Sequence, residues 1–306
     1  MAVENDLGKD KISSLVWKIA IPSMLGQFVS VLYSIVDRMY IGNIPEVGDI
    51  ALAGVGVCGP VVNLVGSVAF LIGVGGAPLV SIRMGEGNLK AAKQVLANCF
   101  LMLCVFSVVL VGGILPFREP MLRLFGASDA TYPYASAYMT IYLLGTLFVM
   151  IGLGMNPFIN SQGFGRVGMM TVGLGAVVNI VLDPIFIFGY CGEALSGTTG
   201  AAVATVIGQF CGAGMTLYFN LNKNPDIQIS FRGFRPSAKA IGRIYTVGLP
   251  SIAMQCVGSV MTFLMNQILM AFTATAVAVF SVYFKLQSFV FMPIFGMNNG
   301  MVPIIG

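Results

Sequence analysis

The stretch that decides the fold is IAIPSMLGQFVSVLYSIVDRMYIG at residues 19–42, a nearly continuous apolar run that contains the carboxylate of Asp37. The run VVNIVLDPIFIFG at 177–189 repeats this combination with Asp183. About 20 apolar residues in succession predict a helix that spans a membrane. A carboxylate near the bilayer centre costs roughly 2.5–3.5 kcal/mol on insertion scales, so such residues are rare unless they bind an ion, a proton or a ligand. Asp37 and Asp183 are therefore the first candidate site residues.

The composition agrees with a membrane protein and excludes several kinds of enzyme. The chain is 57% hydrophobic and 9% charged, whereas soluble domains are about 45–50% apolar. It has no His, which excludes a Ser-His-Asp triad and an HExxH zinc site. The six Cys lie far apart without a CxxC pair, and no DxxxD motif or Ser-Lys dyad supports intramembrane catalysis. We expect no enzymatic activity, no metal site, no cofactor and no nucleic-acid partner.

The apolar runs predict an all-α membrane protein. They are too long and too uniformly apolar for the alternating pattern of a membrane barrel. Eight candidate spanning helices follow from them, at about 14–41, 50–80, 94–116, 132–154, 164–189, 199–221, 239–271 and 275–306.

The distribution of basic residues predicts the orientation. Only Arg38, Arg118 and Arg123 lie on one side, and Lys285 lies inside the last predicted helix. Because basic residues collect in the cytoplasm, we expect a multi-pass protein of the plasma membrane with a cytoplasmic N-terminus. The other basic residues all lie on the opposite side, which is therefore the cytoplasmic one. They are Lys9, Lys11, Lys18, Arg83, Lys90, Lys93, Arg166, Lys223, Arg232, Arg235, Lys239 and Arg243.

An internal repeat relates the two parts of the chain. IAIPSMLGQFVSV (19–31) aligns with VGLPSIAMQCVGS (247–259) at an offset of 228, and GGAPLV (75–80) aligns with GMVPII (300–305) at an offset of 225. Six helices per copy make the repeat parallel, with its symmetry axis along the membrane normal. The second copy contains two of six helices, so we expect a C-terminally truncated chain.

The two acids predict one polar site. The helices that contain them both run outward, and both acids lie one or two turns before the helix end. Tyr33 precedes Asp37 by four residues and Asn179 precedes Asp183 by four, so each pair shares a helical face. These side chains are predicted to line one cavity, with Tyr33, Asp37 and Asp183 facing the substrate. The alternative is that Asn179 and Asp183 only join helices together.

Two prolines lie inside these helices. Pro184 has no N–H and leaves the Ile180 carbonyl without its helical partner, which adds an oxygen beside Asn179 and Asp183. Such an oxygen cluster suits a proton or Na⁺ at Asp37, Asn179 and Asp183. Pro22 is either a hinge or a tolerated kink, and Pro184 is a second hinge candidate. Small-residue spacings elsewhere, as at Gly208 and Gly212, predict close helix packing.

The chain resembles the multidrug and toxic compound extrusion (MATE) family, in its DinF-like and MepA-like branch. The resemblance covers the whole chain and is most specific in NIVLDPIFIFG and in the QGFGR turn. The motifs that carry it are PSMLGQFVSVLYSIVDRMYIG (22–42), MNPFINSQGFGRVGMM (155–170), VVNIVLDPIFIFG (177–189), GAAVAT (200–205) and GMNNGMVPIIG (296–306).

The resemblance implies a helical bundle with a six-helix N-lobe (1–222), a cytoplasmic inter-lobe loop (223–238) and a partial C-lobe (239–306). Eight of an expected twelve spanning helices would then be present. It also implies a bending role for Pro22. Gln255 stands where the NorM-like branch carries an acid. In the N-lobe the resemblance implies an ion-coupling cluster, which consists of Asp37, Asn156, Asn179, Asp183 and Thr205.

These features predict a monomeric antiporter in the lipid bilayer that exports amphipathic, often cationic compounds in exchange for H⁺ or Na⁺. A flippase for lipids or lipid-linked oligosaccharides is the alternative from the same wider superfamily. Flippases typically place basic residues in the cavity to meet phosphate, and here acids outnumber the one embedded base. Lys285 either extends to the interface, pairs with a group in later helices or faces the cavity. A channel fits the repeated, proline-broken helices less well than alternating access.

Overall fold

The chain folds into a bundle of helices, as the apolar runs predicted. The computed structural model describes residues 11–190, 192, 196–224, 227–229 and 236–270, and beyond them only 280, 283, 287, 291, 294, 296–298, 301 and 304. No strand occurs within this part of the chain. The helices are α1 (Ile12–Gly42), α2 (Gly48–Val57), α3 (Gly59–Gly85), α4 (Leu89–Ile114), α5 (Arg118–Leu124), α6 (Tyr132–Leu144), α7 (Thr146–Ser161), α8 (Gly165–Ile187), α9 (Gly197–Tyr218), the short π-helix η2 (Phe219–Lys223) and α10 (Ala238–Met270).

Several of these helices have the length and hydropathy of membrane spans. Five meet both conditions, namely α1, α3, α4, α8 and α9 with η2, and a sixth is added if α6 and α7 form one bent span. The protein is therefore a multi-pass membrane protein, as expected.

Two of the predicted spans are broken, which corrects the expectation of single helices there. The span predicted at 50–80 is divided at Cys58 into α2 and α3, because Pro60 lacks an N–H and fits best in the first turn of a new helix. The span predicted at 132–154 bends by 59° between α6 and α7 and continues to Ser161. At this bend a Cβ on Gly145 would lie 2.4 Å from Val206 of α9, so only Gly allows the close approach.

Some sequence predictions concern residues outside the described part. The helix predicted at 275–306 is described only at scattered positions, and Lys285, Arg232 and Arg235 are not among the described residues. The side chain of Gln255 is likewise outside the description. The helix predicted at 239–271 is observed as α10.

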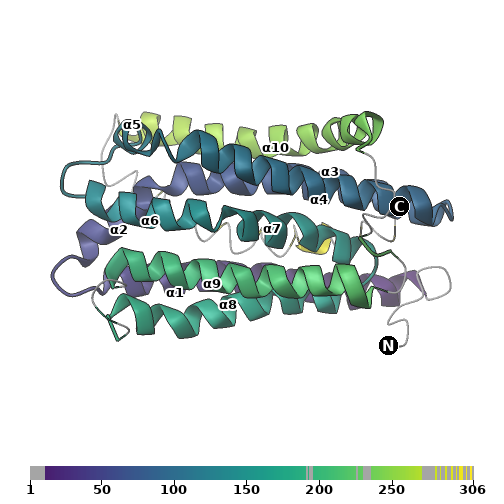
Figure 1. Ribbon diagram of the computed structural model, residues 1–306, viewed down its shortest axis with the longest axis horizontal. Coiled ribbons are helices and arrows are strands. Elements are labelled where there is room, and N and C mark those ends of the chain that lie inside the picture. The colour runs from purple at the N-terminus through teal and green to yellow at the C-terminus, as the bar shows by residue number, and fades with distance from the viewer. Residues whose placement is uncertain are drawn as a thin grey trace.

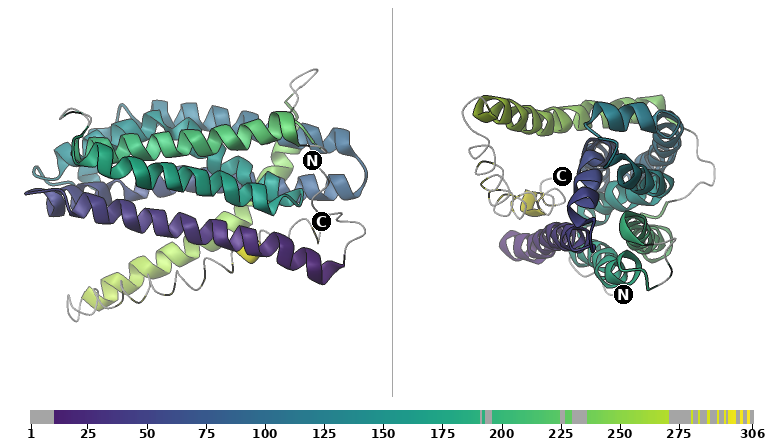
Figure 2. Two further views of the ribbon diagram at one scale, coloured as in Figure 1. Left: turned by 90° about the horizontal axis from the view of Figure 1, so that it is seen from below. Right: turned by 90° about the vertical axis from the view of Figure 1, so that its left-hand side faces the viewer.

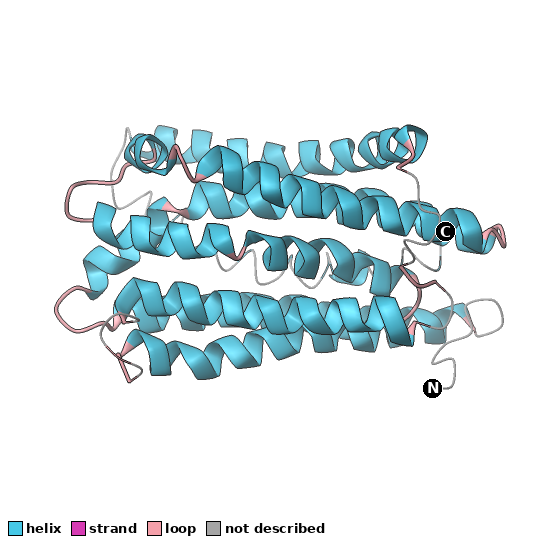
Figure 3. Cartoon of the chain, viewed as in Figure 1, coloured by secondary structure: helices cyan, strands magenta, loops and turns pink. Residues whose placement is uncertain are grey.

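The helices form three tiers along the long axis of the molecule (Figure 1). Helices α1, α8 and α9 form one tier, α6 and α7 the middle tier, and α3, α4 and α10 the third (Figures 1 and 3). Helix α7 contacts α3 and α4 on one side and α8 and α9 on the other. The apolar core lies around this middle tier, where Leu103, Met150 and Phe158 are fully buried. Gly163, with a φ of +87°, makes the turn from α7 into α8.

Helices α8 and α9 pack closely through glycine, which confirms the prediction for Gly208 and Gly212. A Cβ on Gly208 would lie 2.7 Å from the carbonyl oxygen of Gly175, and a Cβ on Gly212 would lie 3.0 Å from that of Thr171. The backbones therefore touch without side chains between them, as in small-residue membrane interfaces.

The contacts of two further glycines follow the internal repeat. A Cβ on Gly248 of α10 would lie 2.4 Å from the carbonyl oxygen of Leu71 in α3, and a Cβ on Gly296 would lie 2.8 Å from that of Ser23 in α1. The offset of 225 relates Leu71 to Gly296, and the offset of 228 relates Gly248 to Ala20, about one turn from Ser23. The two contacts thus lie at approximately equivalent places in the two aligned stretches, and the parallel repeat itself stays a prediction.

The first prediction concerns the crossing of α8 and α9. Gly208→Ala should lower the free energy of unfolding by about 1–3 kcal/mol, because the new methyl group must displace backbone atoms. Gly173→Ala on α8 is the control, since nothing lies within 4 Å of its Cβ position. It should be neutral or stabilise by up to about 1 kcal/mol through helix propensity. Thermal unfolding in detergent measures both, and equal melting temperatures for the two variants would contradict the packing argument.

Candidate functional site

Asp183 lies at the centre of a buried polar cluster between α8 and α9. Its side chain is fully buried, and its Oδ1 accepts a hydrogen bond of 3.1 Å from Nδ2 of Asn179. The same Nδ2 lies 3.4 Å from the hydroxyl of Thr205 on α9. The structure thus brings together Asn179, Asp183 and Thr205, three of the five residues that the resemblance assigned to ion coupling. Gly208, one turn beyond Thr205, allows the approach of α9 to Asn179.

Asp37 reaches the same region from α1. It is 8% exposed, and its charge acts on both Asp183 and Tyr33. The charge of Asp183 also acts on Tyr33. The two acids are therefore buried inside the bundle on neighbouring helices, α1 and α8. Arg38, an exposed neighbour of Asp37, is a cation whose charge acts on that carboxylate.

Three oxygens in this cluster are buried and have no hydrogen-bond donor among the described residues. They are Oδ1 of Asp37, Oδ2 of Asp183 and Oδ1 of Asn179. A buried polar atom without a partner costs about 1–3 kcal/mol, so the arrangement favours a species that supplies positive charge. Carboxylate and amide oxygens suit a proton or a hard monovalent cation. In the described part of the chain, no group of three or more His, Cys, Asp or Glu side chains comes together.

Two aromatic residues beside the acids were not predicted. Tyr138 and Tyr142 on α6 are buried and stack with ring centroids 6.1 Å apart and an interplanar angle of 12°. The charge of Asp37 acts on Tyr138, so this pair borders the acidic cluster. Their spacing of four residues indicates that they share a helical face. Pattern alone does not show whether tyrosines in an apolar run face a polar site or the core.

Asn156 lies in a different polar cluster. Its Nδ2 donates to the Gly168 carbonyl and to the Thr171 hydroxyl, both at 2.9 Å, and its Oδ1 accepts from Asn160 at 3.0 Å. Thr171 and Asp183 are twelve residues apart on α8, or about 18 Å along the axis. The structure therefore does not place Asn156 in contact with the Asp183 cluster. The two clusters lie along one helix and are separated by the Gly175 crossing.

The two hinge candidates both lie inside continuous helices. Helix α1 runs through Pro22 from Ile12 to Gly42, and α8 runs through Pro184 to Ile187. Pro184 leaves the carbonyl of Ile180 without a backbone donor, one turn below it and next to Asn179. An oxygen freed there would lie beside the acidic cluster, and its place in an ion site stays a prediction.

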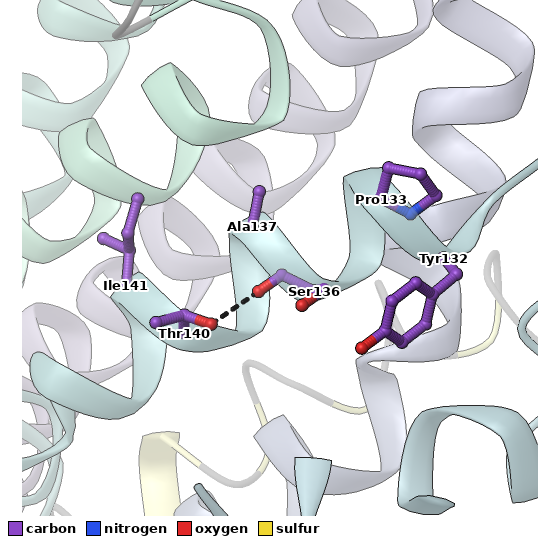
Figure 4. Close-up of a pocket in the computed structure, with 6 residues that line it drawn as sticks. All are labelled: Tyr132, Pro133, Ser136, Ala137, Thr140 and Ile141. Carbon is purple, nitrogen blue, oxygen red and sulfur yellow. Dashed lines mark hydrogen bonds between the residues drawn. The ribbon is translucent and has the colours of Figure 1, made fainter. Parts of the chain in front are cut away.

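A separate groove lies on the other side of α6. It has a volume of about 510 Å³ and is lined by Tyr132, Pro133, Ser136, Ala137, Thr140 and Ile141 (Figure 4). The Thr140 hydroxyl donates to the Ser136 carbonyl at 2.7 Å. Residues two apart on a helix point about 200° apart, so Ser136 and Thr140 face away from Tyr138 and Tyr142. The groove is therefore not part of the acidic site.

The second prediction concerns Asn179. Asn179→Leu should lower the free energy of unfolding by about 1–3 kcal/mol, because Asp183 loses its hydrogen-bond donor while it stays buried. Thr140→Val is the control, since that hydroxyl bonds only within its own helix, and it should cost less than about 1 kcal/mol. Melting temperatures measured at one pH test this, and an equal loss in both variants would argue against a buried bond at Asn179.

Comparison with known proteins gives a consistent result. The MatE family model matches residues 22–185, more than half of the chain. The chain is 25% identical over 286 residues to the multidrug export protein MepA of Staphylococcus haemolyticus (strain JCSC1435), covering 94% of this chain and 62% of the relative. It is 23% identical over 297 residues to MepA of Staphylococcus aureus (strain NCTC 8325 / PS 47), covering 97% of this chain and 64% of the relative. The chain thus spans slightly less than two thirds of these relatives.

Solved structures agree with this match. A crystal structure of a MATE protein in complex with MaD3S has a TM-score of 0.89 and 27% identity, covering 97% of this chain and 66% of that one. The outward-facing conformation of a multidrug resistance MATE family transporter of the MOP superfamily has a TM-score of 0.89 and 26% identity, with 97% and 65% covered. The resemblance noted in the sequence motifs is confirmed, and the chain belongs to the MatE family, in its MepA-like branch.

Proposed function

We propose that the protein is a secondary antiporter that exports amphipathic, often cationic compounds in exchange for H⁺ or Na⁺. The observation that carries the proposal is the pair of buried acids, Asp37 and Asp183, each with a carboxylate oxygen that has no donor among the described residues. The relatives are named multidrug export proteins, and because the chain spans less than two thirds of them, export by this protein is an inference.

The acids supply a mechanism for exchange. A buried carboxylate without a cation is costly, so release of an ion requires that water or a cationic substrate enter in its place. Proton or Na⁺ and the cationic substrate would then compete for Asp37 and Asp183. The ion-loaded and substrate-loaded forms differ in charge and hydration, which biases the rocking of two lobes between inward-open and outward-open states.

The other residues support this scheme. Asn179 donates to the Asp183 carboxylate and also lies within reach of the Thr205 hydroxyl, and the rings of Tyr138 and Tyr142 beside Asp37 suit an aromatic or organic cation. In this scheme Tyr33 lines the substrate cavity with the two acids. The protein acts as a monomer in the plasma membrane with its N-terminus in the cytoplasm, as the distribution of basic residues favours.

The polarity of the interior favours a cationic cargo over the phosphate of a flippase substrate. Within the described part of the chain, the charged residues that are buried are Asp37 and Asp183, both acids. A structurally similar MOP superfamily transporter from Pyrococcus furiosus Vc1 (DSM3638), with a TM-score of 0.88, is described as having a binding pocket of reverse polarity that suggests a different function. The sign of the buried charge is thus a criterion for choosing between a cationic cargo and a phosphate-bearing one.

The third prediction is that Asp37→Asn abolishes coupled export and leaves expression intact. The amide keeps the size of the side chain but cannot exchange a proton or balance a cation. Asp49→Asn is the control, because Asp49 lies exposed in the first turn of α2. Resistance of cells to a toxic organic cation and the amount of protein in the membrane are the measurements. Unchanged resistance in the Asp37 variant would refute the proposed role.

The fourth prediction concerns the coupling ion. Uptake of a fluorescent cation into inverted vesicles should be driven by an imposed pH gradient or by an imposed Na⁺ gradient, and the one that works identifies the ion. The gradient-driven component should disappear in Asp183→Asn. Equal uptake with and without either gradient would exclude antiport and favour a passive pathway.

A further inference from the structure

Helices α1–α9 with η2 are called the first bundle here. The segment that follows η2 and leads to α10 is bound to the first bundle at its beginning. Asn224, directly after η2, is buried and donates through Nδ2 to Oε1 of Gln162 at the end of α7, at 2.5 Å. Its Oδ1 accepts from the backbone N–H of Ile227 at 3.2 Å. One side chain therefore fixes both the end of α7 and the direction of the connecting segment.

The next described residues, 227–229, lie on the bundle with alternating burial. Ile227 is fully buried and Ile229 nearly so, and both belong to the main apolar core, while Gln228 between them is exposed. This is the pattern of an extended segment with one face packed. The N–H of Ile229 donates to the carbonyl of Asn220 in η2 at 3.0 Å.

The segment is bound again where it ends. The backbone N–H of Ser237 donates to Oδ1 of Asn98 in α4 at 3.0 Å, and Asn98 is fully buried. The hydroxyl of Ser237 in turn accepts from the N–H of Ala240 in the first turn of α10. Asn98 thus positions the residue that caps α10, across 139 positions of sequence.

The first part of α10 is held by the same bundle. Ile244 is fully buried in the main core, and a Cβ on Gly75 of α3 would lie 2.5 Å from its carbonyl oxygen. The close contact of Gly248 with Leu71 lies one turn further. The later part of α10, light green in Figure 2 (left), leaves the bundle, and Met254 on it is 78% exposed.

We propose that the described residues 224, 227–229 and 236–248 form a strap that stays bound to the first bundle while the two repeats move relative to each other. This inference rests on the proposed function, because it presupposes the rocking motion. If the strap were released, Asn98 would lose its bond to Ser237 and Asn224 its bond to Gln162. Ile227, Ile229 and Ile244 would lose their packing. The Gly75 and Gly248 contacts also resist sliding, because any displacement along the axis brings side chains against backbone. Motion between the repeats therefore begins beyond Gly248, and not in the loop at 223–238.

Distances between spin labels in the full-length protein test this. One pair is Lys93→Cys with Lys239→Cys, two exposed positions on α4 and on the strap. The comparison pair is Lys93→Cys with Tyr283→Cys, where Tyr283 is an exposed residue of the second repeat. Both pairs are measured in nanodiscs at acidic and alkaline pH, and with and without Na⁺ and a transported cation.

The three outcomes are distinguishable. If the 93–283 distance changes by about a helical turn (~5 Å) or more while the 93–239 distance stays constant, the strap is supported. If the 93–239 distance changes as well, the strap is released during the cycle and the proposal is wrong. If neither distance changes under any condition, the rocking motion itself is contradicted, and the strap proposal is lost together with the proposed function.

A variant tests the hydrogen bond between Asn98 and Ser237 directly. Asn98→Leu removes the acceptor for Ser237, so the 93–239 distance distribution should become broader than in the unsubstituted protein. Gln94→Leu is the matched control. The side chain of Gln94 is exposed and lies one turn away on α4, so this substitution leaves the bond between Asn98 and Ser237 intact. An unchanged distribution in the Asn98 variant would show that the strap does not depend on this bond, and would overturn that part of the proposal.

Discussion

The close crossing of α8 and α9 is the constraint on which the candidate site depends. Asn179 can reach Thr205 only because Gly175 and Gly208 bring the two backbones into contact. In a membrane such a contact is not driven by water, so it must come from packing and from hydrogen bonds between helices. The same contact therefore provides both the stability of the crossing and the position of the Asp183 carboxylate. A larger residue at Gly208 would displace the site together with the helix.

Much of the site was predictable because charge inside an apolar run is a strong signal. Asp37 and Asp183 are both buried, and the four-residue spacing correctly paired Asn179 with Asp183. The sequence could not show that Asn156 bonds elsewhere, since the position of one helix along another depends on tertiary packing. For the same reason the Tyr138 and Tyr142 pair was missed, because an aromatic residue gives no sign of whether it faces an acid or the core. Hydropathy also joined α2 with α3 and α6 with α7, because an apolar window does not register a break at Cys58 or a bend at Gly145.

The buried polar residues of α8 belong to two separate polar clusters along one helical face. Thr171 belongs to the Asn156 cluster and Asn179 to the acidic cluster, with Gly175 between them. In the first cluster the Asn156 amide donates to Gly168 and Thr171 and accepts from Asn160, and Oδ1 of Asn160 has no donor in the described part of the chain. In the second cluster the oxygens without donors include those of two carboxylates. A buried amide oxygen without a donor carries no net charge, whereas a buried carboxylate needs a cation or a proton to balance it. The charge of the unpaired groups therefore separates the first cluster from the one proposed to function.

The reciprocal glycine contacts bear on what the two repeats can be. Gly248 of the second copy packs on Leu71 of the first, and Gly296 packs on Ser23, so each copy completes the surface of the other. The predicted boundary lies at the connecting segment, but Ile244 of α10 packs in the same apolar core as the earlier helices, so the buried contacts continue past that boundary. A boundary predicted from a sequence repeat and the place where buried contacts end are set by different quantities. The first follows from the alignment of similar stretches, and the second from packing between helices.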